Sequence, residues 1–464
     1  MSYSPISHPT SSSSSPPSGV GGNGGRRRRG EGAAPSNDVG PSSSRRRRGR
    51  TTDVWPEPFL EALAIQVAVD AARSFGRLAA APSLANLFQV CSTWRAVSRS
   101  YPLWARLTRQ IWGCIHLNHT TWREEYVYHH RTSWNFRAQR YVHATLSFDP
   151  FDVVGPEGLI CRCLTLSDQH LACGFADGTV RLFDLSTLLH VGTYQPQLDG
   201  GLGLHPRAVS GIAISGSRLI FATLDGDVHV AMLGSGAHLR RAHMGDVLSD
   251  GALVDFAACD RWWVGLYAGV PGRAFHIWDG QTEELVFVGG MLTDPESVRG
   301  WQMLTELTQF VARVRVTGHE SVVACTSTRV ITIHLRDQGV LVLDQRQYRR
   351  GLIVMAMDAN AECYVVVDTR GQAAVRRVDT GVEVCRRFMV RGAGEGRLIG
   401  CMNLGYAMMC TRGVIDVWDV ERGEYLYSLA ERVEEVNVIV ANEQLVAGYC
   451  GEAATIHLWI FGAR

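Results

Sequence analysis

Arginine is the residue type whose placement in this chain most clearly predicts chemistry. A guanidinium group presents a fork of donors that matches carboxylate and phosphate oxygens. Five arginines precede β-like segments that recur through the C-terminal part of the sequence: Arg207, Arg349, Arg350, Arg397 and Arg432. If these segments are inner strands of a ring of sheets, the five side chains share one face and could bind an acidic or phosphorylated client motif. The alternative is that they are solvated, or paired with neighbours such as Glu431 and Glu434.

Patterns that would indicate catalysis are weak. Cys161 and Cys163 fall on an alternating, strand-like segment and lack the spacing of zinc ligands. His129 and His130 have no companion ligands nearby, and the repeated Asp-Gly pairs suit tight turns rather than acid–base chemistry. We therefore expect no metal site, no cofactor and no small-molecule substrate, and we predict that the chain is not an enzyme.

The composition is that of a globular protein with two or three folded units. The chain has 464 residues, of which 46% are hydrophobic. It contains no apolar run of about 18 residues and no apolar segment at the N-terminus, so we expect neither a membrane span nor a secretory signal. Twelve scattered cysteines then read as reduced thiols in the cytosol or nucleus, most of them small buried hydrophobic residues.

The N-terminal segment, residues 1–52, differs from the rest in composition and charge. It is rich in Ser, Pro and Gly and carries a net charge of +7, which leaves −6 for the remainder of the chain. Such a segment is predicted to be disordered. Two arginine clusters fit a nuclear-import signal, with solubility or weak nucleic-acid contact as alternatives: Arg26, Arg27, Arg28, Arg29, Arg45, Arg46, Arg47 and Arg48. No aromatic residue is interleaved with them, so direct DNA binding is not expected.

Helical patterns follow in residues 53–141. In residues 53–113, Pro56 and Pro58 suit a first helical turn, and apolar residues recur at spacings of three and four between Leu84 and Trp94. This spacing predicts an amphipathic helix in a small all-α domain. Residues 114–141 are rich in aromatic residues and arginine, and we expect them to form a helical connector to the next domain.

From residue 142 to 464 the pattern changes to alternation with a period of two, which predicts strands. One strand type recurs seven times, most copies directly after a glycine-containing turn: Thr179–Asp184, Asp227–Val230, Ala274–Asp279, Val330–Ile333, Ala374–Val378, Val414–Asp419 and Thr455–Trp459. The period of roughly 40 to 56 residues is typical of WD-type blades with loop insertions. We therefore predict a mostly β protein with a seven-bladed β-propeller. The last copy lacks a fourth strand, and His143–Phe148 is expected to complete it and close the ring.

A second motif places the chain in a family. Residues 90–104 read Val-Cys-Ser-Thr-Trp-Arg-Ala-Val, then Leu-Trp after five further residues, which is the second half of an F-box. The chain resembles plant F-box/WD-repeat proteins of the STERILE APETALA type over roughly residues 53–464. The segments that carry the resemblance are Asp53–Leu60, Val90–Trp104, Thr121–Glu125, Gly174–Phe183 and Gly269–Asp279.

This resemblance implies a substrate receptor in the nucleus. Its F-box would bind a Skp-type adaptor and, through it, the cullin-RING core of an SCF-type ubiquitin ligase. Its propeller would hold protein clients, with PEAPOD-type and KIX-domain transcriptional repressor complexes implied, in flower and organ development. The alternative function is a non-degradative nuclear scaffold or transcriptional co-regulator, and an enzyme built on the propeller is a third.

An F-box binds by placing an apolar helix face in a groove of the adaptor, where a few bulky anchors supply most of the affinity. The predicted adaptor-facing residues are Pro56, Pro58, Leu60, Leu63, Val90, Leu103 and Trp104. For each of them, packing in the module's own core is the alternative, as it is for Cys91 and Trp94.

One absence bears on the ligase hypothesis: all 46 basic residues are arginine, and the chain has no lysine. Codon bias in a GC-rich genome is one explanation. A second, compatible explanation is that a receptor held beside activated ubiquitin avoids modifying itself, because a guanidinium cannot replace the ε-amine as acceptor.

Overall fold

The computed structural model describes residues 55–147, 155–196, 207–234, 238–290, 313–318, 320–326, 329–336, 339–347, 354–393, 396–433, 436–451 and 453–462. The basic segment 1–52, with both arginine clusters predicted to direct nuclear import, lies outside the described residues, as do Arg349 and Arg350.

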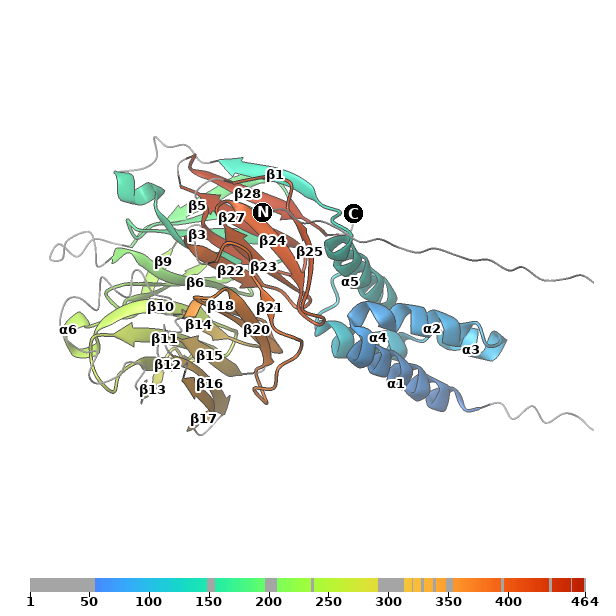
Figure 1. The fold of residues 1–464 in the computed structure, drawn as a ribbon. Coiled ribbons are helices and arrows are strands. Elements are labelled where there is room, and N and C mark those ends of the chain that lie inside the picture. The colour runs from blue at the N-terminus through green and yellow to red at the C-terminus, as the bar shows by residue number, and fades with distance from the viewer. Residues whose placement is uncertain are drawn as a thin grey trace, which may run out of the picture. The chain divides into compact units, whose positions relative to one another are not determined.

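Helices form the first part of the described chain, and Figure 1 shows them in blue and teal. They are α1 (Glu57–Phe75), the 3₁₀ turn η1 (Arg77–Ala79), α2 (Ala80–Phe88), α3 (Ser92–Val97), α4 (Tyr101–Trp112) and α5 (Trp122–Arg137). Helix α1 packs against α2, α3 and α4, and α4 packs against α5. None of the helices in the described ranges combines the length and apolar character needed to cross a membrane.

Local signals explain where α4 and α5 begin and end. The Ser100 hydroxyl accepts a hydrogen bond from an amide in the first turn of α4, and Gly113 ends that helix with a φ of +67°, a conformation that glycine adopts easily. Thr121 and Glu124 form a reciprocal capping box at the start of α5. The loop between Gly113 and Thr121 is therefore held between two well-defined helix ends.

The prediction of one amphipathic helix between Leu84 and Trp94 is wrong. Helix α2 ends at Phe88, and α3 begins at Ser92 after Cys91, whose backbone is extended at φ −162° and ψ 178°. The apolar spacing persists across the break because residues of both helices contact the same apolar cluster. Periodicity here reports a shared core rather than a continuous helix.

Seven four-stranded antiparallel sheets follow in the described residues. The first three are β2 (Cys161–Leu166), β3 (His170–Phe175), β4 (Val180–Asp184) and β5 (Leu189–Tyr194); β6 (Val209–Ser215), β7 (Arg218–Thr223), β8 (Val228–Met232) and β9 (Leu239–His243); β10 (Ala252–Ala258), β11 (Trp262–Ala268), β12 (Phe275–Asp279) and β13 (Leu285–Gly289). The short helices η3 (Pro156–Leu159) and α6 (Val247–Asp250) precede β2 and β10.

The remaining sheets continue the same order. They are β14 (Arg313–Val316), β15 (Ser321–Cys325), β16 (Arg329–Arg336) and β17 (Gly339–Gln347); β18 (Val354–Ala359), β19 (Cys363–Asp368), β20 (Gln372–Arg377) and β21 (Phe388–Met389); β22 (Leu398–Met402), β23 (Tyr406–Thr411), β24 (Val414–Asp419) and β25 (Glu424–Ser428); β26 (Val436–Ala441), β27 (Leu445–Cys450) and β28 (Thr455–Ile460) with β1 (Val142–Ser147).

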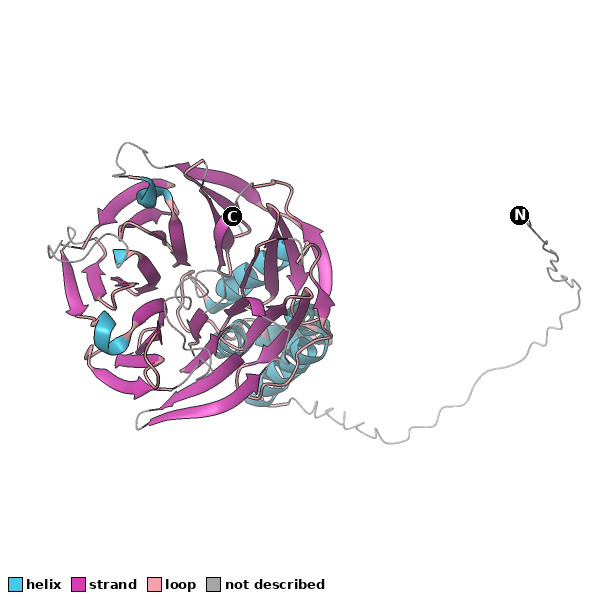
Figure 2. Cartoon of the chain, turned by 60° about the vertical axis from the view of Figure 1, so that its left-hand side comes forward, coloured by secondary structure: helices cyan, strands magenta, loops and turns pink. Residues whose placement is uncertain are grey.

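Strand β1 closes the ring as predicted. It pairs antiparallel with β28, from Val142 opposite Ile460 to Ser147 opposite Thr455, and so supplies the fourth strand of the last sheet. The inner strands β2 and β26 also contact each other, as do all other neighbouring inner strands. Figure 2 shows the resulting ring of sheets. The prediction of a mostly β, seven-bladed propeller preceded by helices is confirmed.

Apolar side chains fill the space between neighbouring sheets. One cluster joins the first and last blades through buried residues such as Phe175, Tyr449 and Leu146, the last of which is on the closing strand. The inner strands approach closely where side chains are missing: a Cβ at Gly211 would lie 2.1 Å from the carbonyl oxygen of Phe256. Glycine at this position therefore allows β6 to pack against β10.

Candidate functional site

Three of the predicted adaptor-facing residues are buried within the helical part of the chain. Leu60 and Leu103 are 1% and 0% exposed, and Trp104 is 8% exposed. All three belong to a single apolar cluster. The indole nitrogen of Trp104 donates to the carbonyl oxygen of Ser98 at 2.7 Å, so its polar atom is also satisfied internally. The prediction that these side chains face an adaptor is therefore wrong, because amphipathic spacing marks a core face as well as a docking face.

The other predicted adaptor contacts are accessible to different degrees. Pro56, Pro58 and Val90 are exposed, and Leu63 is partly buried on α1. Of the two residues considered for the module's own core, Cys91 is exposed and Trp94 is partly buried against it. Adaptor contact by Pro56, Pro58, Leu63 and Val90 stays a prediction.

An exposed aromatic pair at the start of α1 was missed by the sequence reasoning. Trp55 and Phe59 are 54% and 45% exposed, and their rings stack with centroids 4.7 Å apart. Their spacing of four at a helix start, on either side of Pro56 and Pro58, is the signal that could have found them. We call Trp55, Phe59, Val90 and Tyr101 the distal surface.

The elements that carry the distal surface lie close together. The hydroxyl of Ser100, next to Tyr101, donates to the carboxylate of Glu61 on α1. Helix α3, which follows Val90, packs against α1. Figure 1 shows α3 and the start of α1 at the same end of the helical part. Large apolar side chains exposed together in this way are typical of a protein-binding site.

The predicted client-binding arginines share one feature, in that each described member lies in a loop that precedes an inner strand. Arg397 and Arg432 are exposed, whereas Arg207 is partly buried. In the described part of the chain no ion pair joins Arg432 to Glu431, whose Oε2 accepts from Tyr141 and Trp459, and Glu434 lies outside the described residues. Client binding by these arginines stays a prediction.

Further arginines lie on the inner strands, which surround the central channel of a propeller, and the sequence reasoning did not select them. They are Arg162 on β2 and Arg313 and Arg315 on β14. The positive charges of all three lower the pKa of the Cys163 thiol and so oppose the effect of its burial. Two of them act from β14, although β2 and β14 belong to blades that are not neighbours. Their alternation with buried residues along each strand is the signal that could have found them.

The charges in the channel are only partly compensated. Arg315 binds the carboxylates of Asp358 at 2.6 Å and Asp255 at 3.5 Å. Burial raises the pKa of Asp255, and the positive charges of Arg313 and Arg315 oppose that rise. Within the described residues, Arg313 and Arg397 make no ion pair with a carboxylate. Crowding by surrounding atoms and the charge of Arg313 lower the pKa of Arg397, so an anionic group bound between the two arginines would be favourable.

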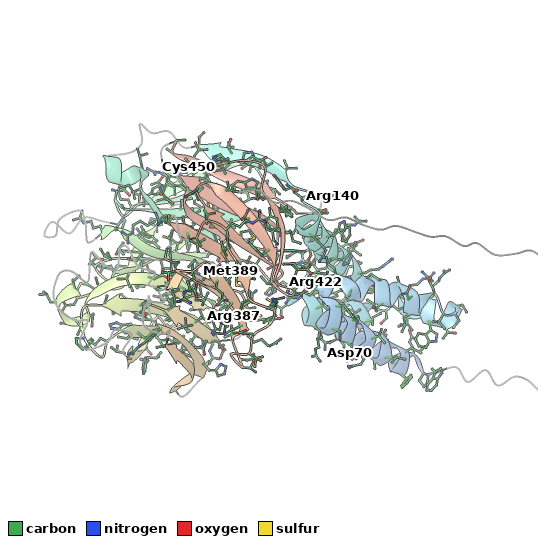
Figure 3. The ribbon with its side chains drawn as sticks, viewed as in Figure 1. Asp70, Arg140, Arg387, Met389, Arg422 and Cys450 are labelled. Carbon is green, nitrogen blue, oxygen red and sulfur yellow. The ribbon has the colours of Figure 1, made fainter. Side chains whose placement is uncertain are left out.

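The helical part is held to the propeller by a cluster around Arg77. Its Nη2 lies 3.0 Å from a carboxylate oxygen of Glu362, and its backbone amide donates to Glu421 Oε2 at 3.1 Å. Burial raises the pKa of Glu421, and Arg77 opposes this effect. Arg422 donates to the carbonyl oxygen of Phe75 at 3.0 Å, and Figure 3 shows this arginine where the strands meet the helices. These contacts connect α1 and η1 with blades five and six.

The histidine pair was wrongly predicted to lack companion ligands. His129 Nε2 lies 3.1 Å from Glu125 Oε1, and His119 Nδ1 lies 2.9 Å from Glu125 Oε2. Cys114 Sγ is also close, 3.9 Å from Glu125 Oε1. The loop before α5 brings Cys114 and His119 onto the helix, which local sequence spacing did not reveal.

The strand cysteines behave as the sequence predicts. Cys161 and Cys163 are buried on β2, and burial raises the pKa of the Cys163 thiol to about 12.

The fold and the exposed surfaces define a WD40-type β-propeller protein with a helical module before the ring. Two solved propellers are similar in fold: the WD40 repeats of RRP9 and the structure of U3-55K, each with a TM-score of 0.50, at 11% and 12% sequence identity, over 68% of this chain and 97% and 98% of those chains. No protein-family model matches the sequence.

A closer relative is the transcriptional regulator STERILE APETALA of Arabidopsis thaliana. The two sequences are 58% identical over 414 residues, which cover 89% of this chain and 93% of that protein. The chain therefore belongs to the STERILE APETALA family, as the sequence resemblance predicted.

Proposed function

We propose that this protein is the substrate-recognition subunit of an SCF-type ubiquitin ligase. In this function the helical module binds a Skp-type adaptor and the propeller holds a protein client. The observation that carries the proposal is the distal surface, where four large apolar side chains are exposed next to the F-box-like segment at residues 90–104. The ubiquitin-transferring step would belong to another subunit, the cullin-RING core.

The distal surface suits a groove-filling contact. Trp55 and Phe59 are already stacked on each other, so ordering them on binding loses little side-chain entropy. Tyr101 is held by a hydrogen bond from Trp122 Nε1 to its hydroxyl oxygen at 2.8 Å. Preorganised aromatic anchors of this kind are typical of residues that dominate the affinity of an interface.

The channel arginines support recognition of an acidic or phosphorylated client segment. Arg313 begins β14 and Arg397 directly precedes β22, so both lie on the side of the ring where loops lead into the inner strands, and the charge of Arg313 lowers the pKa of Arg397. Arg432 is exposed in the equivalent loop of the last blade. Forked donors converging on one opening match carboxylate or phosphate groups.

Adaptor capture tests the proposal. A Skp-type adaptor would be used to pull down the wild type, the Trp55→Ala/Phe59→Ala variant and a control, Trp134→Ala, in which an equally exposed tryptophan on α5 is removed. We expect capture of the wild type and the control but not of the double variant. A wild type that the adaptor does not capture would exclude the receptor function.

A second function, that of a nuclear scaffold or transcriptional co-regulator, is favoured by the name of the Arabidopsis relative, a transcriptional regulator. Both functions use the propeller as a platform for protein partners and place the protein in the nucleus. They differ in whether clients are degraded. Proximity labelling with the proteasome blocked would identify clients, and PEAPOD-type and KIX-domain repressors are the ones proposed.

A further inference from the structure

The polar cluster before and within α5 is a candidate metal centre outside both docking surfaces. Glu125 and His129 are separated by four residues on α5, so they face the same side of the helix. Gly113 ends α4, and the loop after it folds back so that Cys114 Sγ lies 3.9 Å from Glu125 Oε1. The donor atoms of Cys114, Glu125 and His129 all lie within 4.8 Å of one another.

The two oxygens of the Glu125 carboxylate have different surroundings. Oε2 accepts from the backbone amides of Asn118 and His119, both at 2.9 Å, and contacts Nδ1 of His119 at 2.9 Å. Oε1 faces His129 Nε2 at 3.1 Å and Cys114 Sγ at 3.9 Å. One oxygen is thus fixed by the protein while the other points at two potential ligands, which is the arrangement of a metal-binding carboxylate with its outer hydrogen-bond partners.

The distances and the donor types fit zinc. Around a tetrahedral zinc ion, sulfur, nitrogen and oxygen ligands lie roughly 3.4 to 3.6 Å from one another, given bond lengths of about 2.0 to 2.3 Å. The measured separations of 3.1 and 3.9 Å bracket that range. A thiolate, an imidazole and a carboxylate together favour zinc over calcium or magnesium, which prefer oxygen ligands alone.

The surroundings of the cluster also suit a cation. Glu125 is 1% exposed, and only hydrogen-bond donors, not arginine, contact its carboxylate in the described residues. Asn118, whose amide binds Glu125, contacts Asp168 on the propeller at 3.5 Å, which brings a second carboxylate to this region. Cys114 is partly exposed and provides a path for an ion to enter. A dication bound by a thiolate and a buried carboxylate would be neutralised by its own ligands.

We propose that Cys114, Glu125 and His129 bind one zinc ion, with His119 as a positioning residue that holds the Glu125 carboxylate. Water fills the fourth coordination position. On binding, the Cys114 thiol loses its proton to solvent and gives up its hydrogen bond to the carbonyl oxygen of His116. The ion links the loop after α4, through Cys114, to α5, the helix that connects the helical module with the propeller.

Zinc titration of the full-length chain tests this site. The protein would be stripped of metal with a chelator and titrated with zinc chloride, and bound zinc would be counted by elemental analysis. We expect one zinc per wild-type chain, at least tenfold weaker binding for Cys114→Ser, and loss of stoichiometric binding for Cys114→Ser/His129→Gln. The control Cys91→Ala removes an exposed cysteine elsewhere and should bind zinc like the wild type.

Cobalt gives an independent readout of the thiolate ligand. The wild type loaded with cobalt should show a sulfur-to-metal charge-transfer band that Cys114→Ser lacks, while circular dichroism confirms that both are folded. Equal zinc binding by the wild type and the double variant would overturn the proposal and leave Glu125 as a hydrogen-bonded structural group. Adaptor capture, measured on the same preparations, reports the receptor function separately.

Discussion

The distal surface and the channel opening are both exposed, yet they differ in chemistry. At the distal surface, large apolar side chains project from helix ends and the ring of Trp55 rests on Phe59. At the channel, Arg313 and Arg397 from different blades add positive charge, and neither makes an ion pair with a carboxylate in the described part of the chain, although Arg313 acts on the buried Asp255. The first surface binds by removing apolar area from water and the second by charge. Added salt should therefore weaken one interaction and leave the other almost unchanged.

The largest effect is expected at the distal surface. In Trp55→Ala/Phe59→Ala, each lost anchor should weaken adaptor binding by about 2 kcal/mol, or roughly a thousandfold for the pair. Titration calorimetry with the Skp-type adaptor measures this change. Raising the salt concentration should not alter the ratio between wild type and variant, and a ratio that collapses in salt would contradict the apolar character of this contact.

The second largest effect is expected at the junction between the helical part and the propeller, around Arg77. Arg77→Ala removes a side chain that is 12% exposed, together with its ion pairs to Glu362 and Glu421, and leaves Glu421 with the backbone amide alone. The expected loss in the free energy of unfolding is about 2 kcal/mol, visible as a lower melting temperature. Arg73→Ala, an exposed arginine one turn earlier on α1, is the control. A melting temperature that is equal in both variants would show that the junction does not stabilise the fold.

A smaller effect is expected at the channel opening. Arg313→Ala/Arg397→Ala should weaken binding of a poly-glutamate peptide about tenfold, because two charge-assisted contacts are lost. Between about 50 and 200 mM salt, the wild type should lose affinity and the variant should change less. Fluorescence anisotropy measures both, with Arg106→Ala/Arg131→Ala on the helices as the control. No peptide binding by the wild type would exclude recognition through this opening.

The smallest effect is expected in how the stability contributed by Glu383 depends on pH. Hydrogen bonds from Arg387 and Arg376 lower the pKa of Glu383 to about 2. Because an unfolded glutamate titrates near 4.3, the charged carboxylate stabilises the fold above that pH, and this contribution disappears as the pH falls towards 2. The melting temperature of Glu383→Gln should therefore lie below that of the wild type at pH 7 and approach it at pH 3. Glu284→Gln, on an exposed glutamate of the third blade, should show no such convergence.

Sequence patterns predicted the ring better than the surfaces. Each blade repeats the same alternation and most repeat the glycine turn, so seven copies reinforce one interpretation, and the closing strand followed from the missing fourth strand. The helical module offers no repetition. There, Leu103 and Trp104 carry the strongest F-box signal and are buried, while Trp55 and Phe59 stand outside the motif. Motif strength reflects the core of the module as much as its docking face.

The sequence by itself determined that a basic, low-complexity segment precedes helices and a seven-bladed ring, because composition and periodicity are local properties of the chain. Tertiary structure alone decided which charges meet across the channel and which donors surround Glu125. Arg313 and Arg397 are 84 positions apart in the numbering, and Cys114 lies on a loop that folds back onto α5. The closure of the ring sets the first pair of neighbours, and the local signals that end α4 at Gly113 and begin α5 at Thr121 do not show that the loop between them folds back onto α5.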